Sequence, residues 1–260
     1  MDASPTTGDL QGIIDELRGL DSDLPEAHAG LREDMVTPEA LASDIGMIEA
    51  WLETQGIAAD GMDDKTRAAY LIGGMAWSVC LWMAALELTG KALPIRRVAF
   101  RQERYWYHFG DGSSHEYVRY PIAFEVGAGP AEHRTTLEEM FAPLIAAVMV
   151  TSGLSAGAQW RLLADNVASA FLYAGKALGM AGRGMDLSRE IIAEGRLDNG
   201  KTGFVEIRAG EACDWFLVRG GCCRFYTTAG GEYCTSCVLR KRDDQVARYT
   251  DYLASLQTLE

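Results

Sequence analysis

Four cysteines that fall within sixteen residues constrain the C-terminal part of this chain more than any other feature. Their spacing is C-C-x10-C-x2-C, over Cys222, Cys223, Cys234 and Cys237. Two intervening residues let the thiolates of a C-x2-C turn converge on one metal. Four thiolates this close would repel one another without a cation. The spacing therefore predicts a compact metal-binding module.

The spacing alone does not decide which metal is bound. Structural zinc sites commonly use two separated cysteine pairs, whereas here Cys222 and Cys223 are adjacent and their side chains diverge. Divergent neighbours suit a larger, two-iron target, and the ten-residue spacer with Gly230 and Gly231 is long enough to loop around a cofactor. The pattern favours a [2Fe–2S] cluster, with tetrahedral zinc and a redox-active disulfide pair as alternatives.

The rest of the chain has the composition of an ordinary globular protein. Of its 260 residues, 48% are hydrophobic and 23% are charged, which excludes mainly disordered, collagen-like, coiled-coil and disulfide-scaffold chains. The net charge of −13 argues against a nucleic-acid partner, because phosphate contacts need Lys and Arg. Residues 1–64 carry −14, residues 65–218 are neutral and residues 219–248 carry +3. The acidic block is typical of a solvated face, with a docking surface for a basic partner as the alternative.

Two uncharged stretches, residues 68–86 and 140–160, are long enough to span a membrane. Both are interrupted by Gly and Ser, so we expect buried core helices and no integral membrane span. The first residues lack a basic segment followed by an apolar one, so no secretory signal is expected. We therefore expect a cytoplasmic protein whose six cysteines serve metal or redox chemistry rather than disulfides.

Helical patterns dominate the chain. Apolar spacing predicts a short helix at 10–17, and Thr37 followed by Pro38 predicts the start of another. This second helix is expected to end at Gly56 and to bury Leu41, Ile45, Ile48 and Leu52. A long apolar helix is expected over 63–89, and Thr135 with Glu138 has the pattern of a capping box that opens the next one. Further helices are expected over 155–178, 187–194 and 238–256.

Strand patterns are fewer. Residues 95–109 and 115–126 flank a turn-rich loop and predict a long antiparallel hairpin. Residues 204–208 and 213–218 predict a second strand pair that leads into the cysteines. We therefore expect an α+β fold, mainly helical, with a small antiparallel sheet. The expected organisation is an acidic helical segment over 1–60, a substrate-binding part over 61–212, and a C-terminal [2Fe–2S] module with its helix over 213–260.

The run RGGCCRFYTTAGGEYCTSCVLRKR, residues 219–242, resembles the C-terminal module of the siderophore-iron reductase family, the FhuF-like ferric iron reductases. The cysteine spacing, the glycine before the pair and the Tyr-Cys before C-x2-C carry the resemblance, and residues 160–166 are similar more loosely. The resemblance implies one-electron reduction of Fe(III) in imported ferric siderophores, with release of Fe(II). It also implies that the ligands of the [2Fe–2S] cluster are Cys222, Cys223, Cys234 and Cys237.

No nicotinamide or flavin site is recognisable, so we expect electrons from an external donor such as a ferredoxin. The basic run Arg240, Lys241 and Arg242 is the expected docking face for an acidic donor, with an anionic ferric siderophore as the alternative partner. Arg224, next to the cysteine pair, is expected to place its charge near an iron or a sulfur. The alternatives are a non-enzymatic electron carrier or redox sensor, and a zinc-stabilised binding module. The pattern leaves the siderophore type open between hydroxamate, catecholate and carboxylate.

The remaining candidates are expected to be structural. Cys80 and Cys213 are expected to pack as small hydrophobic residues, and Asn166 to make a buried hydrogen bond, with substrate contact as the alternative. Residues 179–184 imitate part of a dinucleotide fingerprint but follow a helix, so a helix end is expected there. The four histidines lack metal-ligand spacing and are assigned no site.

Overall fold

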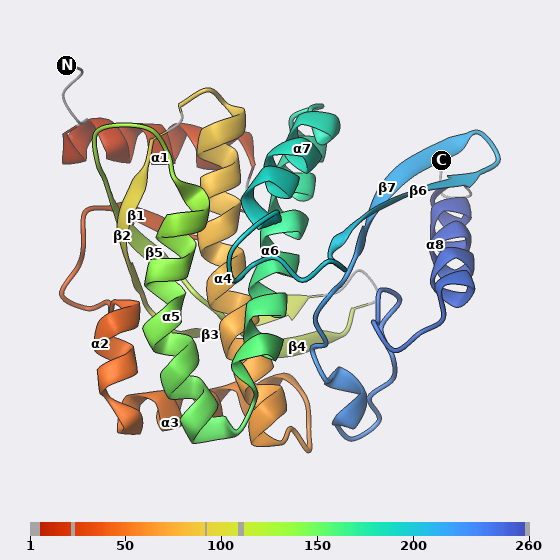
Figure 1. Cartoon of the computed structure of the whole chain (residues 1–260), viewed down its shortest axis with the longest axis horizontal. Helices are drawn as coiled ribbons and strands as arrows, with labels where there is room; N and C mark the ends of the chain where they lie inside the picture. The colour runs from red at the N-terminus through yellow and green to blue at the C-terminus, as the bar shows by residue number, and fades with distance from the viewer. Residues whose placement is uncertain (1–5, 22–23, 92, 109–111, 258–260) are drawn as a thin grey trace.

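The computed structural model describes residues 6–21, 24–91, 93–108 and 112–257. Helices make up 53% and strands 17% of the part of the chain that the structure describes, which confirms the expected α+β, mainly helical fold (Figure 1). The α-helices are α1 (Thr7–Leu20), α2 (Pro38–Ser43), α3 (Ile45–Gln55), α4 (Asp64–Leu88), α5 (His133–Ser152), α6 (Ala156–Ala177), α7 (Ala181–Ile192) and α8 (Arg242–Gln257). The strands are β1 (Ala27–Ala29), β2 (Ile95–Phe100), β3 (Glu103–His108), β4 (Ser114–Arg119), β5 (Ile122–Val126), β6 (Gly203–Ala209) and β7 (Ala212–Val218). Short 3-10 helices are η1 (Gly56–Ala58) and η2 (Phe225–Thr227).

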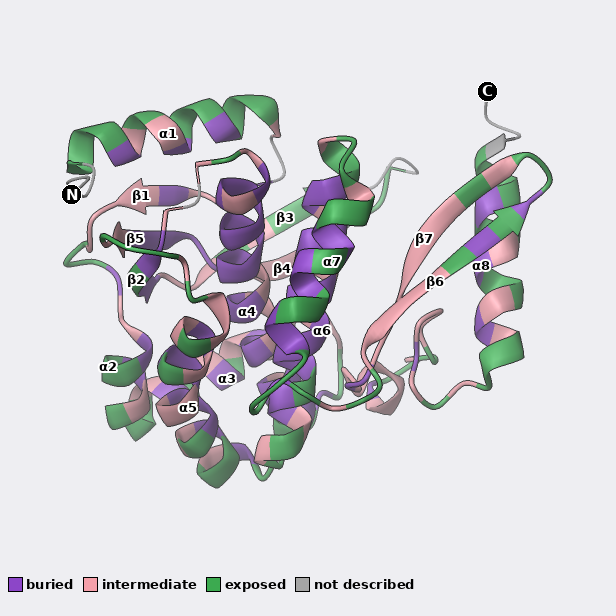
Figure 2. Cartoon of the chain, turned by 45° about the horizontal axis from the view of Figure 1, so that its top comes forward, coloured by how far each residue is buried: buried purple, intermediate pink, exposed green. Residues whose placement is uncertain are grey.

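Helix α4 lies at the centre of the molecule and packs mainly against α6 (Figure 1). Its bounds follow the prediction, since Asp63 caps the first turn and Gly90, with φ of 73°, follows the last. It is long and apolar enough to cross a membrane, yet 78% of its most apolar window is buried inside the fold (Figure 2). The other uncharged stretch is divided between α5 and α6 by Gly153, whose φ is 72°. Both stretches therefore act as core helices here.

The predicted long hairpin is bent into two pairings. Strand β5 pairs antiparallel with β2 and parallel with β1, which gives the strand order β1-β5-β2. Beyond the bend the same two arms continue as a separate antiparallel pair, β3 and β4. The second predicted pair is confirmed as β6 and β7. Phe109 of the predicted first arm lies outside the described residues.

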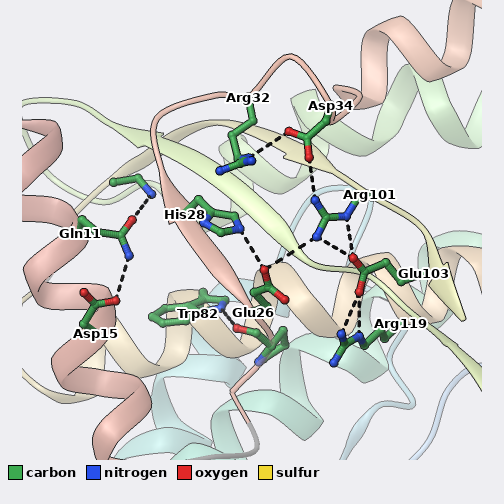
Figure 3. Close-up of polar contacts among 12 residues, drawn as sticks. Gln11, Asp15, Glu26, His28, Arg32, Asp34, Trp82, Arg101, Glu103 and Arg119 are labelled. Atoms are coloured by element: carbon green, nitrogen blue, oxygen red, sulfur yellow. Dashed lines mark hydrogen bonds and ion pairs between the residues drawn. The ribbon is translucent and has the colours of Figure 1, made fainter. Parts of the chain in front are cut away.

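Arg101 holds the bend between β2 and β3 (Figure 3). Its guanidinium contacts Asp34 at 2.6 Å, Glu103 at 2.6 Å and Glu26 at 3.7 Å. Glu103 also pairs with Arg119 across the ribbon at 2.9 Å. Burial alone would raise the pKa of Glu103, but these two arginines outweigh it and lower that pKa. The network joins the N-terminal loop to both arms where the strand ladder is interrupted.

The predicted helix at 38–55 is divided in two. Thr37 and Pro38 start α2 as expected, but Asp44 ends it and its carboxylate caps α3 by accepting the Met47 N–H. The division rotates the second part, so Ile45 is 59% exposed and its predicted burial is wrong. Leu41, Ile48 and Leu52 are buried as predicted.

Three other helix starts differ from the prediction. The capping box at Thr135 is wrong, because α5 begins at His133 and the Glu138 carboxylate accepts the backbone N–H of Arg196 instead. Gly179 does end α6, but α7 begins at residue 181 rather than 187. A Cβ at Gly184 would lie 2.2 Å from the Phe171 carbonyl oxygen, so this glycine lets α6 and α7 approach closely. Helix α8 begins at 242 rather than 238, because residues 238–241 belong to the cysteine-bearing loop.

A second, smaller hydrophobic cluster lies between the β6–β7 pair and α8. Its buried members are Ile207, Ala209, Tyr249 and Leu253. Tyr249 stacks on Phe216 with ring centroids 4.4 Å apart, and its hydroxyl donates to the Leu217 carbonyl. This pair of strands and α8 stand beside the helical body, and the loop with the cysteines lies between them (Figures 1 and 2). The division of the chain at residues 60 and 212 stays a prediction.

Candidate metal centre

The four clustered cysteines lie on one loop, residues 219–241, that leaves β7 and enters α8. The Cys234 thiol hydrogen-bonds to Cys223, which lowers the pKa of Cys223 and raises that of Cys234. Burial raises the pKa of Cys222, and the charges of Cys223 and Cys237 add to this effect. One cysteine of each pair is therefore in contact with the other pair, since Cys223 meets Cys234 across the ten-residue spacer.

The other cysteines lie elsewhere. Cys80 is fully buried in α4, as predicted, and burial raises the pKa of its thiol. Cys213 is exposed on β7 beside Glu206, so its predicted packing role is wrong. It occupies a strand position whose side chain faces away from the small cluster against α8.

The loop offers thiols and N–H donors of the kind that a [2Fe–2S] cluster needs. Such a cluster is held by two thiolate pairs and accepts N–H donors at its sulfurs. Among the described residues, no group of three Cys, His, Asp or Glu side chains is placed to hold a metal ion. The Arg224 backbone N–H lies 3.4 Å from Cys222 Sγ, and the Phe225 N–H donates to Cys223. The buried Nε of Arg224 has no hydrogen-bond partner in the described part of the chain, so it is a donor available to a group that the loop holds.

Arg224 itself adopts a left-handed conformation with φ of 62°. Such a φ costs on the order of 1 kcal/mol for a residue with a Cβ, so a compensating contact is expected. Its guanidinium donates to Asp63 at 2.6 Å. The structure thus places the backbone of Arg224 against the cysteines, while its charge is paired with Asp63.

Asp165 of α6 anchors the start of the loop. This carboxylate is buried and accepts the N–H groups of Gly220 at 2.7 Å and Gly221 at 2.9 Å. It also accepts from Thr202 and pairs with Arg219 at 3.2 Å. Burial raises the pKa of Asp165, and Arg219 and the glycine N–H groups oppose that rise. A Cβ at Gly221 would lie 2.9 Å from the backbone of α6, so the glycine before the cysteine pair permits this close approach.

Arg219 is the cation whose charge acts on the thiols. Its side chain is only 18% exposed, and it lowers the pKa of Cys223 while opposing the rise at Cys222 and Cys234. These effects are reciprocal, since Asp165, Cys223 and Cys234 together raise the pKa of Arg219 despite its burial. Arg219 is therefore held as a permanent positive charge between Asp165 and the loop.

The N-terminus of α4 holds the middle of the loop. Asp63 binds Arg224, Thr66 Oγ1 lies 3.0 Å from Thr227 Oγ1, and the Ala229 N–H donates to the Asp60 carbonyl at 2.8 Å. We call these three contacts, made by residues 60–66 to residues 224–229, the α4 clasp. It connects the helical core to the spacer between the two cysteine pairs.

Arg240, just before α8, and Gln245, in the first turns of α8, hold the second cysteine pair. Arg240 donates to the Cys234 carbonyl at 2.9 Å and to Asp244 at 2.6 Å. The buried Gln245 donates to the Cys237 carbonyl at 2.7 Å. The C-x2-C turn is thus fixed through its backbone carbonyls, and these contacts do not involve its sulfurs.

A cavity of about 610 Å³ adjoins the loop beside Cys222. Its walls include apolar side chains, among them Leu154, Val218 and Val238, and the aromatic ring of Tyr226. Six cationic side chains also line it: Arg161, Lys201, Arg219, Arg224, Arg240 and Arg242. Cys222 is the single cysteine that borders this cavity among the residues described there, and Cys237 is 5% exposed on the protected side.

Sequence reasoning did not single out Asp165, Arg219, Asp63 or Gln245. One signal was present in the sequence. Asp165 is the one charged residue between Arg161 and Lys176, in a stretch that is otherwise uncharged. A carboxylate there indicates a buried polar contact, as does the neighbouring Asn166. Asn166 is half-buried and donates to the Leu162 carbonyl at 2.8 Å, which satisfies it within its own helix.

The comparison with known protein families matches the segment that carries the four clustered cysteines. A family model for the FhuF 2Fe-2S C-terminal domain matches residues 219–239, which include all four clustered cysteines. This short match supports a FhuF-like relationship and a 2Fe–2S cluster for the loop. No curated protein and no solved structure matches the chain significantly.

Proposed function

We propose that this protein is an oxidoreductase that reduces Fe(III) in ferric siderophores by one electron and so releases Fe(II). The single observation that carries the proposal is the match of residues 219–239, the loop that carries the four clustered cysteines, to the FhuF 2Fe-2S C-terminal domain. In this proposal Cys222, Cys223, Cys234 and Cys237 hold the [2Fe–2S] cluster. When bound, such a cluster supplies or accepts one electron at a time.

The chemistry of the substrate matches a one-electron donor. A siderophore surrounds Fe(III) with hard oxygen donors, which hold Fe(II) far more weakly because its charge is lower. One electron therefore frees the metal and leaves the organic ligand intact. A protein that carries out this reaction needs a concave site for the complex directly beside its redox centre.

The residues of this chain supply those conditions. The cavity beside Cys222 brings a bound complex close to the loop. Asp165, the α4 clasp and Arg240 with Gln245 hold the loop at its start, middle and end, so little rearrangement accompanies a change of charge. Arg219 is a fixed positive charge close to the cysteines, and such a charge favours the reduced state of a cluster held there.

The proposal also includes a separate electron donor of the ferredoxin type and a cytoplasmic site of action. The external donor is supported by the resemblance and by the lack of a recognisable nucleotide fingerprint in the sequence. The cytoplasmic site is supported by the lack of a recognisable secretory signal in the first residues. The donor would deliver one electron for each Fe(III) reduced, which balances the reaction.

The test is anaerobic oxidation of the reduced protein by a panel of ferric siderophores, with a strong Fe(II) chelator present. We expect recovery of the oxidised visible spectrum together with one Fe(II) captured per electron lost. Reduced protein that no ferric siderophore oxidises, but that exchanges electrons with a carrier protein, would instead support the electron-carrier or sensor function. Colourless, zinc-loaded protein would support the binding module.

A further inference from the structure

The cavity beside Cys222 is strongly cationic in a chain that is acidic as a whole. Six Lys or Arg side chains line it, and no Asp or Glu is among its lining residues in the described chain. The whole protein carries −13, so this local surplus runs against the overall balance. Concave walls with one sign of charge concentrate ligands of the opposite sign.

The six cations fall into two groups. The first group forms ion pairs with carboxylates: Arg219 with Asp165, Arg224 with Asp63, and Arg240 with Asp244. These pairs stabilise the loop. Arg161, Lys201 and Arg242 make no ion pair with any described carboxylate, and all three are exposed. They come from α6, from the loop before β6 and from the start of α8, and they meet only at this cavity.

We infer that the cavity binds a ferric complex of net negative charge, of the catecholate or carboxylate class, in preference to a neutral hydroxamate complex. The inference rests on the proposed function. A four-thiolate [2Fe–2S] cluster has a net charge of about −2 when oxidised. The three unpaired cations Arg161, Lys201 and Arg242 exceed that charge, and the remaining positive surplus matches an anion better than a neutral complex. The volume of about 610 Å³ lies in the range of small-molecule sites, roughly 300–1,000 Å³.

The same cations act on the charge that the bound complex gains during electron transfer. One electron passes from the reduced protein to Fe(III), which becomes Fe(II), and the oxygen ligands stay attached until the metal dissociates. The protein is oxidised by one electron and the complex becomes more negative by one charge. Because each nearby cation stabilises added negative charge, Arg161, Lys201 and Arg242 stabilise the reduced complex more than the oxidised one.

Gallium complexes separate binding from reduction, because Ga(III) has the charge of Fe(III) and is not reduced by such a protein. Binding of three probes to the cluster-loaded protein is measured by calorimetry: gallium tris-catecholate, gallium citrate and a neutral gallium tris-hydroxamate. We expect an anionic probe to bind at least about tenfold more tightly than the neutral one, and its affinity to fall as salt is added. Tight binding of the tris-catecholate identifies the catecholate class, and tight binding of the citrate identifies the carboxylate class.

Substitutions of residues that line the cavity test whether the cavity is responsible for this preference. Arg161→Gln with Lys201→Gln should weaken binding of the anionic probe by about tenfold or more and leave the neutral probe unchanged. Arg183→Gln, an exposed arginine of α7 outside the cavity, is the matched control and should change neither. Arg242→Gln is a second, independent variant with the same expected pattern.

Two results would overturn the inference: equal affinity for neutral and anionic probes, or a variant that weakens both to the same extent. Failure of the proposed function is a different result, since reduced protein would then be oxidised by no ferric complex whatever its charge. A protein that reduces neutral ferric hydroxamates as fast as anionic complexes retains the proposed function and contradicts the inference.

Discussion

Arg219 and Arg224 flank the adjacent cysteines and act on them in different ways. Arg219 places a largely buried charge that lowers the pKa of Cys223 and opposes its rise at Cys222 and Cys234. Arg224 instead places its backbone N–H against Cys222, and its guanidinium pairs with Asp63. The expectation that the Arg224 guanidinium lies near an iron or a sulfur stays a prediction. The geometry makes Arg219 the stronger candidate for setting the reduction potential.

Replacement of Arg219 should lower the midpoint potential. Reduction adds negative charge, so loss of a nearby cation disfavours it, by an amount on the order of tens of millivolts after screening. Arg219→Gln should show this shift in a potentiometric titration, and Arg219→Lys should retain most of the wild-type value. Arg224→Gln should shift the potential less. An unchanged potential in Arg219→Gln, with the cluster intact, would remove Arg219 from this role.

Replacement of Asp165 should destabilise the loop. Asp165→Asn removes the carboxylate partner of the largely buried Arg219 and weakens the contacts to Gly220 and Gly221, at a cost of about 3 kcal/mol in free energy of unfolding. Denaturant unfolding of the loaded protein measures this loss, and cluster release should become faster. The control is Asp186→Asn, an exposed pair partner of Arg189 on α7, which should change stability by less than about 0.5 kcal/mol. Equal stability of the two variants would contradict the anchoring role of Asp165.

For single residues, the sequence predicts which residues form the metal site better than it predicts which distant residues contact them. The cysteine spacing is local, so four thiolates on one loop follow from it directly. The partners of Asp165 lie more than thirty residues away, and the pairing of Arg224 with Asp63 spans 161 positions. Such contacts depend on how α4 and α6 pack, which no local pattern specifies.

Among the elements, the α4 clasp is the contact most sensitive to acid. Burial alone would raise the pKa of Asp63, but hydrogen bonds from Thr66 and Arg224 outweigh it and hold that pKa at about 2, below its ordinary 3.8. A carboxylate with a lowered pKa contributes stability above its unfolded value, and that contribution is lost as pH falls through the folded value.

The free energy of unfolding should therefore differ most between wild type and Asp63→Asn at pH 5 and above. The difference should shrink as pH falls from about 4 toward 2, because the wild-type carboxylate is then protonated. Asp64→Asn, the neighbouring exposed residue that does not touch the loop, is the control and should lie close to wild type throughout. A difference for Asp63→Asn that is constant across this range would contradict the pKa assignment.

Elements with strong local signals were predictable, and those shaped by distant contacts were not. The caps at Asp63 and Ser155 and the apolar runs between them and Gly90 or Gly179 mark α4 and α6. The bend between β2 and β3 depends on Arg101 meeting carboxylates from the N-terminal loop, so the sequence shows one long arm. The early start of α7 depends on Gly184 fitting against α6.

At the scale of the whole molecule, the cationic cavity forms only when segments distant in the sequence fold together. Its three unpaired cations lie on elements separated by forty residues or more along the chain, so their convergence is visible only in the fold. The charge partition along the sequence did place the positive end at residues 219–248. It could not separate the cations that pair with carboxylates from those that face a ligand.

Donor docking is expected to use the exposed Lys241, which neighbours the second cysteine pair and does not line the cavity. Reduction by an acidic ferredoxin should be faster at low salt and slow as ionic strength rises, because charge steers the encounter. Lys241→Glu should slow this reduction and leave gallium-complex binding unchanged, and Arg183→Glu is the matched control. Stopped-flow rates that do not depend on salt would contradict this docking face.

The central claim is that the four clustered cysteines hold a two-iron cluster. The most direct measurement is iron, acid-labile sulfide and zinc content of anaerobically purified protein, together with the electron paramagnetic resonance spectrum after one-electron reduction. The account predicts two irons, two sulfides and one unpaired spin per chain. Serine at Cys222, Cys223, Cys234 or Cys237 should cost iron, whereas Cys80→Ser and Cys213→Ser should keep it. One zinc and no sulfide per chain, or iron lost on replacement of Cys213 in folded protein, would contradict the account.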